Sequence, residues 1–341
     1  LHTVRVALQT SQTSQTSQTS RFGIRQVGTA KGRITLNGKP VYLKGVNRHE
    51  AHYEFGATTP VQLMYEDIRN LKDLGGNFIR GAHYAQSDDF LTLCDELGVL
   101  VWEESLGWGN KDKEMSDPEF IRLQVEQTDL MVRNSFNHPS VIVFAFMNEL
   151  DSQTAVGKAL VEKLAATIRL RDSGRLVSFA TYHNTDDVSH VHSDLVAFNS
   201  YPGWIDWGFR MGDPAEMRAR MDAVYAECVK YYRAKSPGKP ILVSETGACA
   251  LYGRRDLAAS SWSEDYQAEY VGNALDWATS PESGVCGVAI WQFADSASYG
   301  REHLNPGARG KVLGQNLGGI LDGYRREKLA ARVVREKFAG R

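Results

Sequence analysis

The sequence predicts an α/β protein built on a (β/α)8 barrel, the TIM-barrel architecture, preceded by a short β segment. After Val41, eight short apolar runs alternate with longer helical patterns, as in a parallel sheet wrapped by helices. No Gly-x-Gly-x-x-Gly motif follows the first run, so a doubly wound dinucleotide-binding sheet fits less well. A chain of 341 residues is long enough for one barrel with loop insertions.

The first part of the chain has a different character. Residues 1–8 alternate apolar and polar side chains, which predicts a strand. Residues 9–20 are four Gln-Thr-Ser repeats without an apolar side chain to bury, so we expect a loose connecting loop there. Asn37-Gly38 separates residues 33–36 from the apolar run that begins at Lys39 and predicts a tight hairpin turn. This hairpin leads into the barrel.

The eight predicted barrel strands end near Asn47, Arg80, Glu103, Asn148, Ala180, Asn199, Ser244 and Gln292. Long helices are expected at residues 60–74, 118–136, 154–171, 214–233 and 262–278. Thr59-Pro60 and Asp117-Pro118 each combine an N-cap residue with a proline in the first turn, which marks two helix starts.

Composition and charge exclude several classes of function. Lys and Arg total 39 against 41 Asp and Glu, so the net charge of −2 offers no general attraction to nucleic acid or to an anionic membrane. No apolar run approaches the ~18–20 residues that span a bilayer. The four cysteines are too sparse for a disulfide framework, which favours the cytoplasm while leaving the compartment open. The start at Leu1 is compatible with a fragment.

Two predicted strands end in a glutamate. The apolar fourth strand stops at Asn148-Glu149, and the seventh continues from Ser244 into Glu245. Active sites of such barrels lie at the carboxyl ends of the strands, so the two carboxyl groups can converge across the barrel mouth. Paired carboxyl groups suit glycosidic bond cleavage, with retention at a separation of ~5–5.5 Å and inversion at ~6.5–9.5 Å. A single glutamate at a strand end would more often be a salt-bridge partner.

Ordered motifs along the chain resemble family 2 glycoside hydrolases, which include β-galactosidases and β-glucuronidases. The similarity covers residues 22–337. The motifs are Asn37-Gly38-Lys39-Pro40, Asn47-Arg48-His49-Glu50, Arg80 with His83-Tyr84, Asn137-His138-Pro139-Ser140, Asn148-Glu149, Ser244-Glu245 and Trp291-Gln292-Phe293-Ala294-Asp295. The resemblance implies that residues 1–27 are remnant strands of an immunoglobulin-like domain and that residues 28–341 form the catalytic barrel. It also implies that a jelly-roll domain lies upstream in the family.

The resemblance assigns roles at the barrel mouth. It implies that Glu149 is the general acid and base and Glu245 the nucleophile, with Asn148 bound to the sugar 2-hydroxyl. Tyr201 matches the tyrosine that donates to the nucleophile, and Arg80 matches the arginine that keeps this carboxylate ionised.

Further positions match the sugar-binding part of the family site. His49, His83 and Trp291 correspond to the floor and walls around the sugar, where an indole face can stack on a pyranose. Asn199 lies in the same motif as the tyrosine, and Trp204, just after it, is a second candidate wall.

One position departs from the glucuronidase pattern. These enzymes recognise the substrate carboxylate with an Asn-x-Lys motif, and here Asn316 is present while Gly318 replaces the lysine. Lys311, Arg301 or Arg309 in the same loop are candidates to supply a cation instead, although solvated loop charges are the commoner case. Both β-galactosides and uronides therefore stay open as substrates.

No cofactor or metal is expected. His49-Glu50-Ala51-His52 and His190-Val191-His192 lack a third nominated ligand, and the region after the third strand lacks the Glu-x-His of magnesium-binding relatives. Trp108 and Trp207 are candidates to border the leaving-group site, with surface packing the alternative.

The resulting hypothesis is a retaining, exo-acting β-glycoside hydrolase. Its partner is a carbohydrate substrate, and a homo-oligomer is compatible with the sequence. The alternative is a noncatalytic carbohydrate-binding barrel, or a fragment with low activity that lacks its upstream domains. A metal-dependent amidohydrolase needs His-x-His at the first strand, which the sequence does not have.

Overall fold

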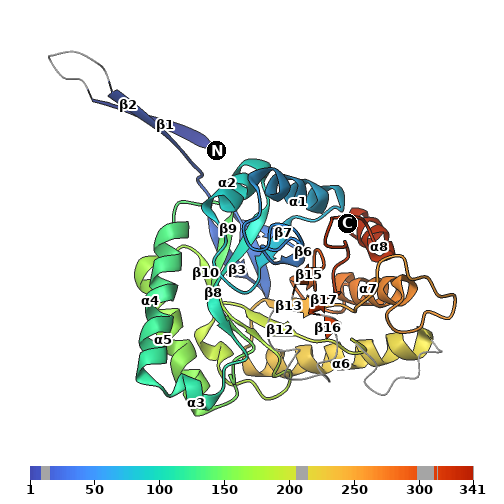
Figure 1. Cartoon of the computed structure of the whole chain (residues 1–341). Coiled ribbons are helices and arrows are strands. Elements are labelled where there is room, and N and C mark those ends of the chain that lie inside the picture. The colour runs from blue at the N-terminus through green and yellow to red at the C-terminus, as the bar shows by residue number, and fades with distance from the viewer. Residues whose placement is uncertain (9–15, 205–213, 298–310, 313, 341) are drawn as a thin grey trace.

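The computed structural model describes residues 1–8, 16–204, 214–297, 311–312 and 314–340. Its main sheet is fully parallel, in the order β10-β9-β8-β7-β6-β14-β13-β12-β11. Phe179 separates β10 from β11, so these two pieces share one strand position and the predicted eight positions are confirmed (Figure 1). The strands are β6 (Leu43–Arg48), β7 (Phe78–Gly81), β8 (Leu100–Trp108), β9 (Val141–Asn148), β10 (Leu176–Ser178), β11 (Ala180–Thr181), β12 (Val196–Asn199), β13 (Ile241–Thr246) and β14 (Gly287–Ile290).

Helices surround this sheet (Figure 1). They are α1 (Val61–Asp73), α2 (Asp88–Leu97), α3 (Asp112–Met115), α4 (Pro118–Ser135), α5 (Ala155–Arg171), α6 (Pro214–Lys235), α7 (Glu264–Thr279) and α8 (Leu329–Ala339), with a 3-10 turn at η1 (His190–His192). All five predicted long helices are present. Helix α2 is not among the predicted helices, although the Ser87 hydroxyl accepts a hydrogen bond at its N-terminus and left-handed Gly98 ends it.

Two helix starts were predicted wrongly. Thr59 is not the N-cap of α1; Pro60 takes this position without a side-chain bond, and the Thr59 hydroxyl has no partner among the described atoms. Helix α7 begins at Glu264 rather than Trp262, because the Ser263 hydroxyl accepts from the Tyr266 amide and caps the first turn. The Asp117 cap of α4 is confirmed.

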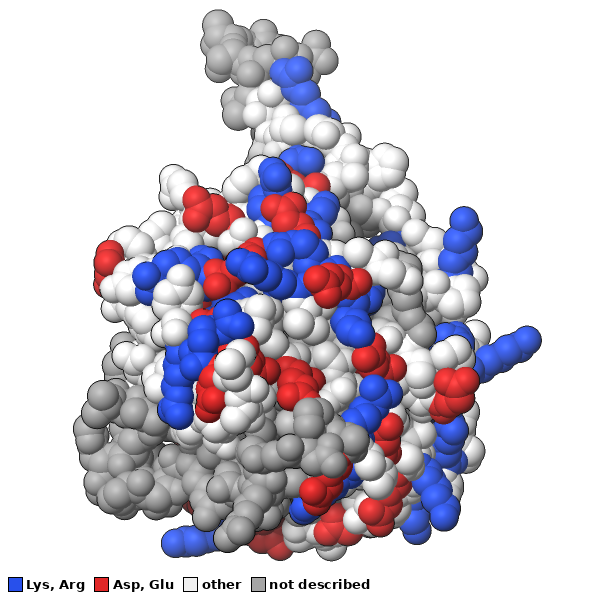
Figure 2. Space-filling model, turned by 90° about the vertical axis from the view of Figure 1, so that its right-hand side faces the viewer, with Lys and Arg blue, Asp and Glu red and all other residues white. Residues whose placement is uncertain are grey.

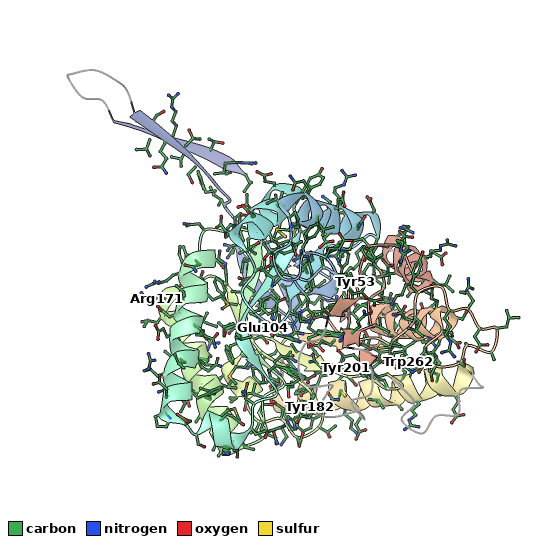
Figure 3. The ribbon with its side chains drawn as sticks, in the orientation of Figure 1. Tyr53, Glu104, Arg171, Tyr182, Tyr201 and Trp262 are labelled. Atoms are coloured by element: carbon green, nitrogen blue, oxygen red, sulfur yellow. The ribbon has the colours of Figure 1, made fainter. Side chains whose placement is uncertain are left out.

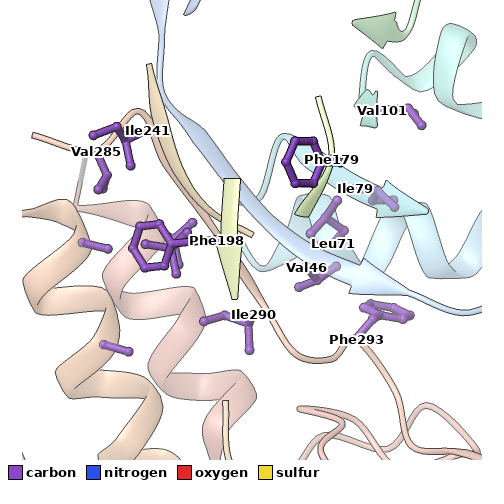
Figure 4. Packing of buried hydrophobic residues seen from close by; sticks show 14 of the residues in the cluster. Val46, Leu71, Ile79, Val101, Phe179, Phe198, Ile241, Val285, Ile290 and Phe293 are labelled. Atoms are coloured by element: carbon purple, nitrogen blue, oxygen red, sulfur yellow. The ribbon is translucent and has the colours of Figure 1, made fainter. Parts of the chain in front are cut away.

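The apolar core has two parts. One cluster fills the space between the strands and the helices and includes Val46, Ile79, Phe198 and Ile290 (Figure 4). A second cluster contains the inward-facing residues of the strands, such as Trp102. Strand β9 is buried along its whole length, as its continuous apolar run predicts. The two clusters hold the strand ends in fixed positions.

A small antiparallel sheet closes the amino-terminal end of the barrel. It consists of β3 (Val27–Ala30), β4 (Arg33–Leu36) and β5 (Lys39–Val41). The predicted turn is confirmed, since Asn37 and Gly38 have positive φ of 53° and 76°. Ile34 is fully buried in the cluster of inward-facing residues, together with Leu43 at the start of β6. The hairpin therefore plugs the barrel.

The remaining strands lie outside the barrel. β1 (His2–Leu8) pairs antiparallel with β2 (Thr16–Phe22), and this ribbon projects from the molecule (Figure 1). The prediction of a loop at residues 9–20 is therefore wrong for residues 16–20, because their backbone groups find a paired strand although no side chain can be buried. An immunoglobulin-like origin of residues 1–27 stays a prediction. Near the barrel mouth, β15 (Ser296–Ala297), β17 (Gln315–Asn316) and β16 (Lys311–Val312) form a third small sheet.

Charges of both signs are mixed on the surface. Figure 2 shows Lys and Arg interspersed with Asp and Glu on one face of the molecule. Among the described helices, none combines the length and the apolar character that a bilayer crossing requires. The four cysteines are buried and form no disulfide bond, which agrees with the prediction that they are too sparse for a disulfide framework.

Candidate active site

The two glutamates lie at the carboxyl ends of two strands, β9 and β13, that are not neighbours in the barrel wall. Glu149 directly follows β9 with a positive φ of 55°, and its amide donates to the carbonyl of Ala180 on β11 at 2.9 Å. Glu245 is the penultimate residue of β13 and only 3% exposed. Figure 3 labels Glu104 and Tyr201, which lie in the middle of the molecule near these strand ends, whereas Arg171 lies on the outer helix α5.

Glu245 is held by a cation and a phenol. The Arg80 guanidinium donates to Oε1 of Glu245, and the Tyr201 hydroxyl donates to Oε2 at 2.5 Å. His83 Nε2 lies 3.8 Å from Oε1. Burial and the negative charge of Glu245 raise the pKa of Tyr201 well above its ordinary value, so this phenol stays a donor.

Arg80 is the centre of the network and is fully buried. Its Nη1 donates to Oδ1 of Asn47 at 2.9 Å and its Nη2 to Oδ1 of Asn148 at 2.9 Å, while Nε and Nη2 both reach Glu104, at 3.1 and 2.8 Å. Burial alone would lower the pKa of Arg80, but Glu104 and Glu245 outweigh it and raise the pKa. The guanidinium is therefore a permanent positive charge.

Glu104 belongs to the site but was missed by the sequence analysis. It accepts from Trp102 Nε1 at 2.8 Å and lies 3.1 Å from His83 Nδ1, in addition to its bonds with Arg80. Burial raises its pKa, but Arg80 and His83 together lower it below the ordinary value. The signal was available, since side chains alternate along a strand and Glu103 and Glu104 at the predicted strand end must face opposite sides. β8 extends to Trp108, five residues past the predicted end.

Glu149 has different neighbours. Asn199 donates from Nδ2 to Oε1 of Glu149 at 2.8 Å, and the indole of Trp108 also hydrogen-bonds this carboxyl group. Burial, followed by the nearby charge of Glu245, raises the pKa of Glu149. Its described polar contacts are thus an amide and an indole rather than a guanidinium.

Asn148 links the two carboxyl groups and retains an unused donor. Its Oδ1 accepts from Arg80 and from Asn199 Nδ2, the latter at 3.0 Å. Its own Nδ2 is buried without a partner among the described atoms. A buried amide donor of this kind is suited to a ligand hydroxyl.

Aromatic rings form a wall beside the network. His83 and Trp291 stack with centroids 5.2 Å apart, and His49 meets Trp291 edge-on at 5.3 Å. Burial lowers the pKa of His49 to about 3, so this ring is neutral. Trp204 packs edge-on against Tyr201 at 4.7 Å. Cis peptide bonds precede His83 and follow Trp291.

Gly318, which replaces the lysine of the glucuronidase motif, lies against these aromatic rings. Oδ1 of Asn316 accepts from the amide of Gly318 at 3.1 Å. A Cβ on Gly318 would lie 3.1 Å from Trp204 and 3.2 Å from Trp291, so a side chain here would crowd both rings. Arg301 and Arg309 lie outside the described residues, as does the side chain of Lys311.

The described residues contain no cluster of three His, Cys, Asp or Glu side chains suited to a metal ion. His190 stacks on Phe179 at 4.2 Å and bonds Ser193, and burial lowers its pKa. Trp207 is outside the described part of the chain, whereas Trp108 lies at the mouth.

Known proteins are similar to this chain over most of its length. The family description "Glycosyl hydrolases family 2, TIM barrel domain" matches residues 27–339. The chain is 29% identical over 342 residues to the β-glucuronidase of Rattus norvegicus, covering 99% of this chain and 50% of that enzyme. Against the β-glucuronidase of Canis lupus familiaris, the identity is 30% over 320 residues, with 93% and 46% covered. The chain thus spans about half the length of these relatives.

Solved structures are similar as well. A family 2 β-galacturonidase from Eisenbergiella tayi, bound to galacturonate, has a TM-score of 0.87 and 33% identity, covering 95% of this chain and 56% of that chain. A β-glucuronidase from Ruminococcus gnavus, in complex with D-glucaro 1,5-lactone, has a TM-score of 0.82 and 25% identity, with 95% and 54% covered. With its eight-position barrel and its ordered motifs, the chain belongs to glycosyl hydrolase family 2 and carries the TIM barrel domain of that family.

Proposed function

We propose that this chain is the catalytic barrel of a retaining, exo-acting β-glycoside hydrolase. The observation that carries the proposal is a difference between two carboxyl groups in one network: Glu245 is ion-paired, whereas the half-buried Glu149 forms no ion pair with the described residues and has a raised pKa. Such a pair divides into a nucleophile and an acid.

In the first step, Glu245 attacks the anomeric carbon of the sugar. Arg80 and Tyr201 donate to the two oxygens of Glu245, so they orient this carboxylate and stabilise its negative charge before the attack. Glu149 gives its proton to the glycosidic oxygen as the bond to the leaving group breaks.

In the second step, Glu149 takes a proton from a water molecule, which attacks the glycosyl ester on Glu245 and releases the sugar with its original configuration. The unused Nδ2 of Asn148 is suited to bind the 2-hydroxyl of the sugar throughout both steps. Trp291, stacked on His83, offers an indole beside that sugar.

We propose a terminal hexuronide as the sugar. The support comes from the relatives, which are β-glucuronidases and a β-galacturonidase bound to galacturonate. Gly318 argues against ordinary glucuronidase recognition, since the family lysine is absent at this position. A β-galacturonide is therefore the first substrate to test, with the β-glucuronide and the neutral β-galactoside as comparisons.

The test measures hydrolysis of the three aryl β-glycosides by the wild-type chain, Glu149→Ala and Glu245→Ala. We expect each variant to lose activity by at least about 10³-fold, because each removes a group required in the reaction. Azide added to Glu245→Ala should restore turnover and give the α-glycosyl azide, since the small anion replaces the missing nucleophile.

Each outcome decides between the candidates. Undiminished turnover by Glu245→Ala would refute the assignment, and β-configured azide products from that variant would refute retention through Glu245. Binding of the sugar acid without turnover by the wild-type chain would favour the noncatalytic barrel. An exposed carboxylate variant, Glu126→Ala on α4, serves as the matched control and should keep full activity.

A further inference from the structure

The last residues of β8 extend along the strand that carries the acid. Trp108 pairs with Asn148, and the amide of Gly109 donates to the carbonyl of Asn148 at 2.8 Å. The Trp108 side chain is 47% exposed, whereas the neighbouring Gly107 is buried. A large aromatic ring therefore lies at the barrel mouth, one strand away from Glu149.

Close packing fixes this segment. A Cβ on Gly107 would lie only 2.6 Å from Cγ of Met147 and 3.3 Å from its Cα, so only glycine lets β8 approach β9 this closely. Beyond Trp108, the carbonyl of Asn110 accepts from the amide of Asp151 at 3.0 Å. The backbone on either side of the indole is thus bound to the segment that carries Glu149.

The indole of Trp108 directs its one polar group, the ring N–H, at the carboxyl group of Glu149. Tryptophan has one donor, the Nε1–H, and Trp108 hydrogen-bonds the carboxyl group of Glu149. The other described bond to this group comes from Asn199, which lies on a different strand. Two donors from two sides therefore fix the direction of the carboxyl group.

The exposed part of the ring lies where a leaving group must pass. Protonation requires the glycosidic oxygen to come within ~2.6–3.2 Å of the carboxyl group of Glu149. Since the indole bonds the same carboxyl group, the first atoms of the leaving group come close to the ring. Farther out, Lys111 donates to the hydroxyl of Tyr182 at 2.9 Å and to Asp151 at 2.8 Å, which adds a polar rim; Tyr182 is labelled in Figure 3.

From these contacts we propose that Trp108 is a positioning residue for the acid and the aromatic wall of the leaving-group site. Its N–H holds the Glu149 carboxyl group in line with the glycosidic oxygen, and its ring packs against the first group of the aglycone. This inference rests on the proposed acid role of Glu149. It favours flat or aromatic aglycones, because a ring face gains most from stacking on an indole.

Two variants separate the functions of the N–H and the ring. Trp108→Phe removes the donor and keeps an aromatic face, and Trp108→Ala removes both. We measure kcat/KM for aryl glycosides whose phenols range from acidic to weakly acidic, and for an alkyl glycoside. Trp108→Phe should change the dinitrophenyl glycoside less than about 3-fold and slow the alkyl glycoside by about 10–100-fold, because only a poor leaving group needs the proton.

Trp108→Ala should add a rise in KM for all aryl substrates. Tyr65→Ala, an exposed aromatic on α1, is the matched control and should change neither quantity. An equal loss for all leaving groups in Trp108→Phe would overturn the positioning role. An unchanged KM in Trp108→Ala would overturn the wall.

The pH profile gives a second readout. The hydrogen bond from Trp108 lowers the pKa of Glu149, so its removal should move the high-pH limb of kcat/KM to higher pH. If the high-pH limb of kcat/KM stays in place or moves to lower pH in Trp108→Phe, the hydrogen bond between Trp108 and Glu149 is contradicted.

A third measurement does not depend on turnover, so failure of the proposed function stays distinguishable. The indole N–H resonance of Trp108, identified by its absence in Trp108→Phe, should shift with pH in the wild-type chain and cease to do so in Glu149→Gln. A resonance insensitive to pH, or equally sensitive in Glu149→Gln, would overturn the inference. If no glycoside is hydrolysed while the resonance behaves as expected, the proposed reaction fails and the contact stands.

Discussion

The ends of β9 and β13 present the same functional group in opposite surroundings. At the end of β13, Glu245 meets the buried guanidinium of Arg80 and the hydroxyl of Tyr201. At the end of β9, Glu149 meets Asn199 and Trp108, and burial together with the charge of Glu245 raises its pKa. In the proposed mechanism, the neighbouring groups rather than the residue type give the two glutamates different chemical tasks.

The largest effect should come from removing the cation from the β13 side. Arg80→Gln leaves Glu104 and Glu245 buried without their counter-charge. We expect about 3–5 kcal/mol less stability in urea unfolding and a loss of activity of at least about 10³-fold, because uncompensated buried charges are costly. Glu245 would then keep the hydroxyl of Tyr201 but lose its counter-charge, which reduces the difference between the two strand ends.

Arg171→Gln is the control for this prediction. Arg171 forms an ion pair with Asp129 on the outer surface, where screening limits its contribution to about 0–1 kcal/mol. Equal changes in the free energy of unfolding for the two variants would show that the buried Arg80 network stabilises the fold no more than a surface ion pair does.

A smaller effect should follow from removing only the phenol. Tyr201→Phe loses one hydrogen bond to a charged group, equivalent to about 1.5–3 kcal/mol, so kcat/KM should fall by about 10–100-fold. Stability should change little, since the ring stays in place. Tyr231→Phe, whose hydroxyl binds a carbonyl away from the site, should keep full activity, and an equal fall there would remove the specific role of Tyr201.

An effect on the pH dependence of stability, and not on activity, concerns a carboxyl group with no proposed catalytic role. Glu103 faces away from Arg80 and accepts from the Gln86 amide and the Ser135 hydroxyl, and burial raises its pKa to about 8. Because this pKa is higher in the folded than in the unfolded chain, the stabilising effect of the protonated form is present at low pH. It is lost as the pH rises from about 4.5 to about 8.

Glu103→Gln mimics the protonated form and should flatten this decline, which amounts to at most about 1.4 kcal/mol per pH unit. Urea unfolding across that pH range measures it. A decline just as steep in Glu103→Gln would show that the raised pKa of Glu103 does not cause the loss of stability. It would also weaken the argument that burial raises the pKa of Glu149.

The sequence predicted the barrel and the convergence of strand ends, because apolar runs and their terminal polar residues are local patterns. It placed Glu149, Glu245, Arg80 and Tyr201 in one site. It missed Glu104, because a prediction of strand ends is uncertain by a few residues and β8 continues beyond Glu103.

Other features depend on contacts that no local pattern encodes. The pairing of residues 16–20 with β1 arises from backbone hydrogen bonds between polar segments, which hydrophobic periodicity does not detect. The bond between Trp108 and Glu149 depends on the close approach of β8 and β9 at Gly107, which becomes visible only in three dimensions.

The central claim, that the surroundings give the two glutamates different tasks, can be tested directly at Glu149. Its carboxyl carbon resonance, identified by its absence in Glu149→Gln, is followed through a pH titration in the wild-type chain and in Glu245→Gln. We expect a wild-type midpoint above the ordinary glutamate value of 4.5, and a lower midpoint in Glu245→Gln, because a repelling charge has been removed. A wild-type midpoint at or below the ordinary value, unchanged by Glu245→Gln, would contradict the account.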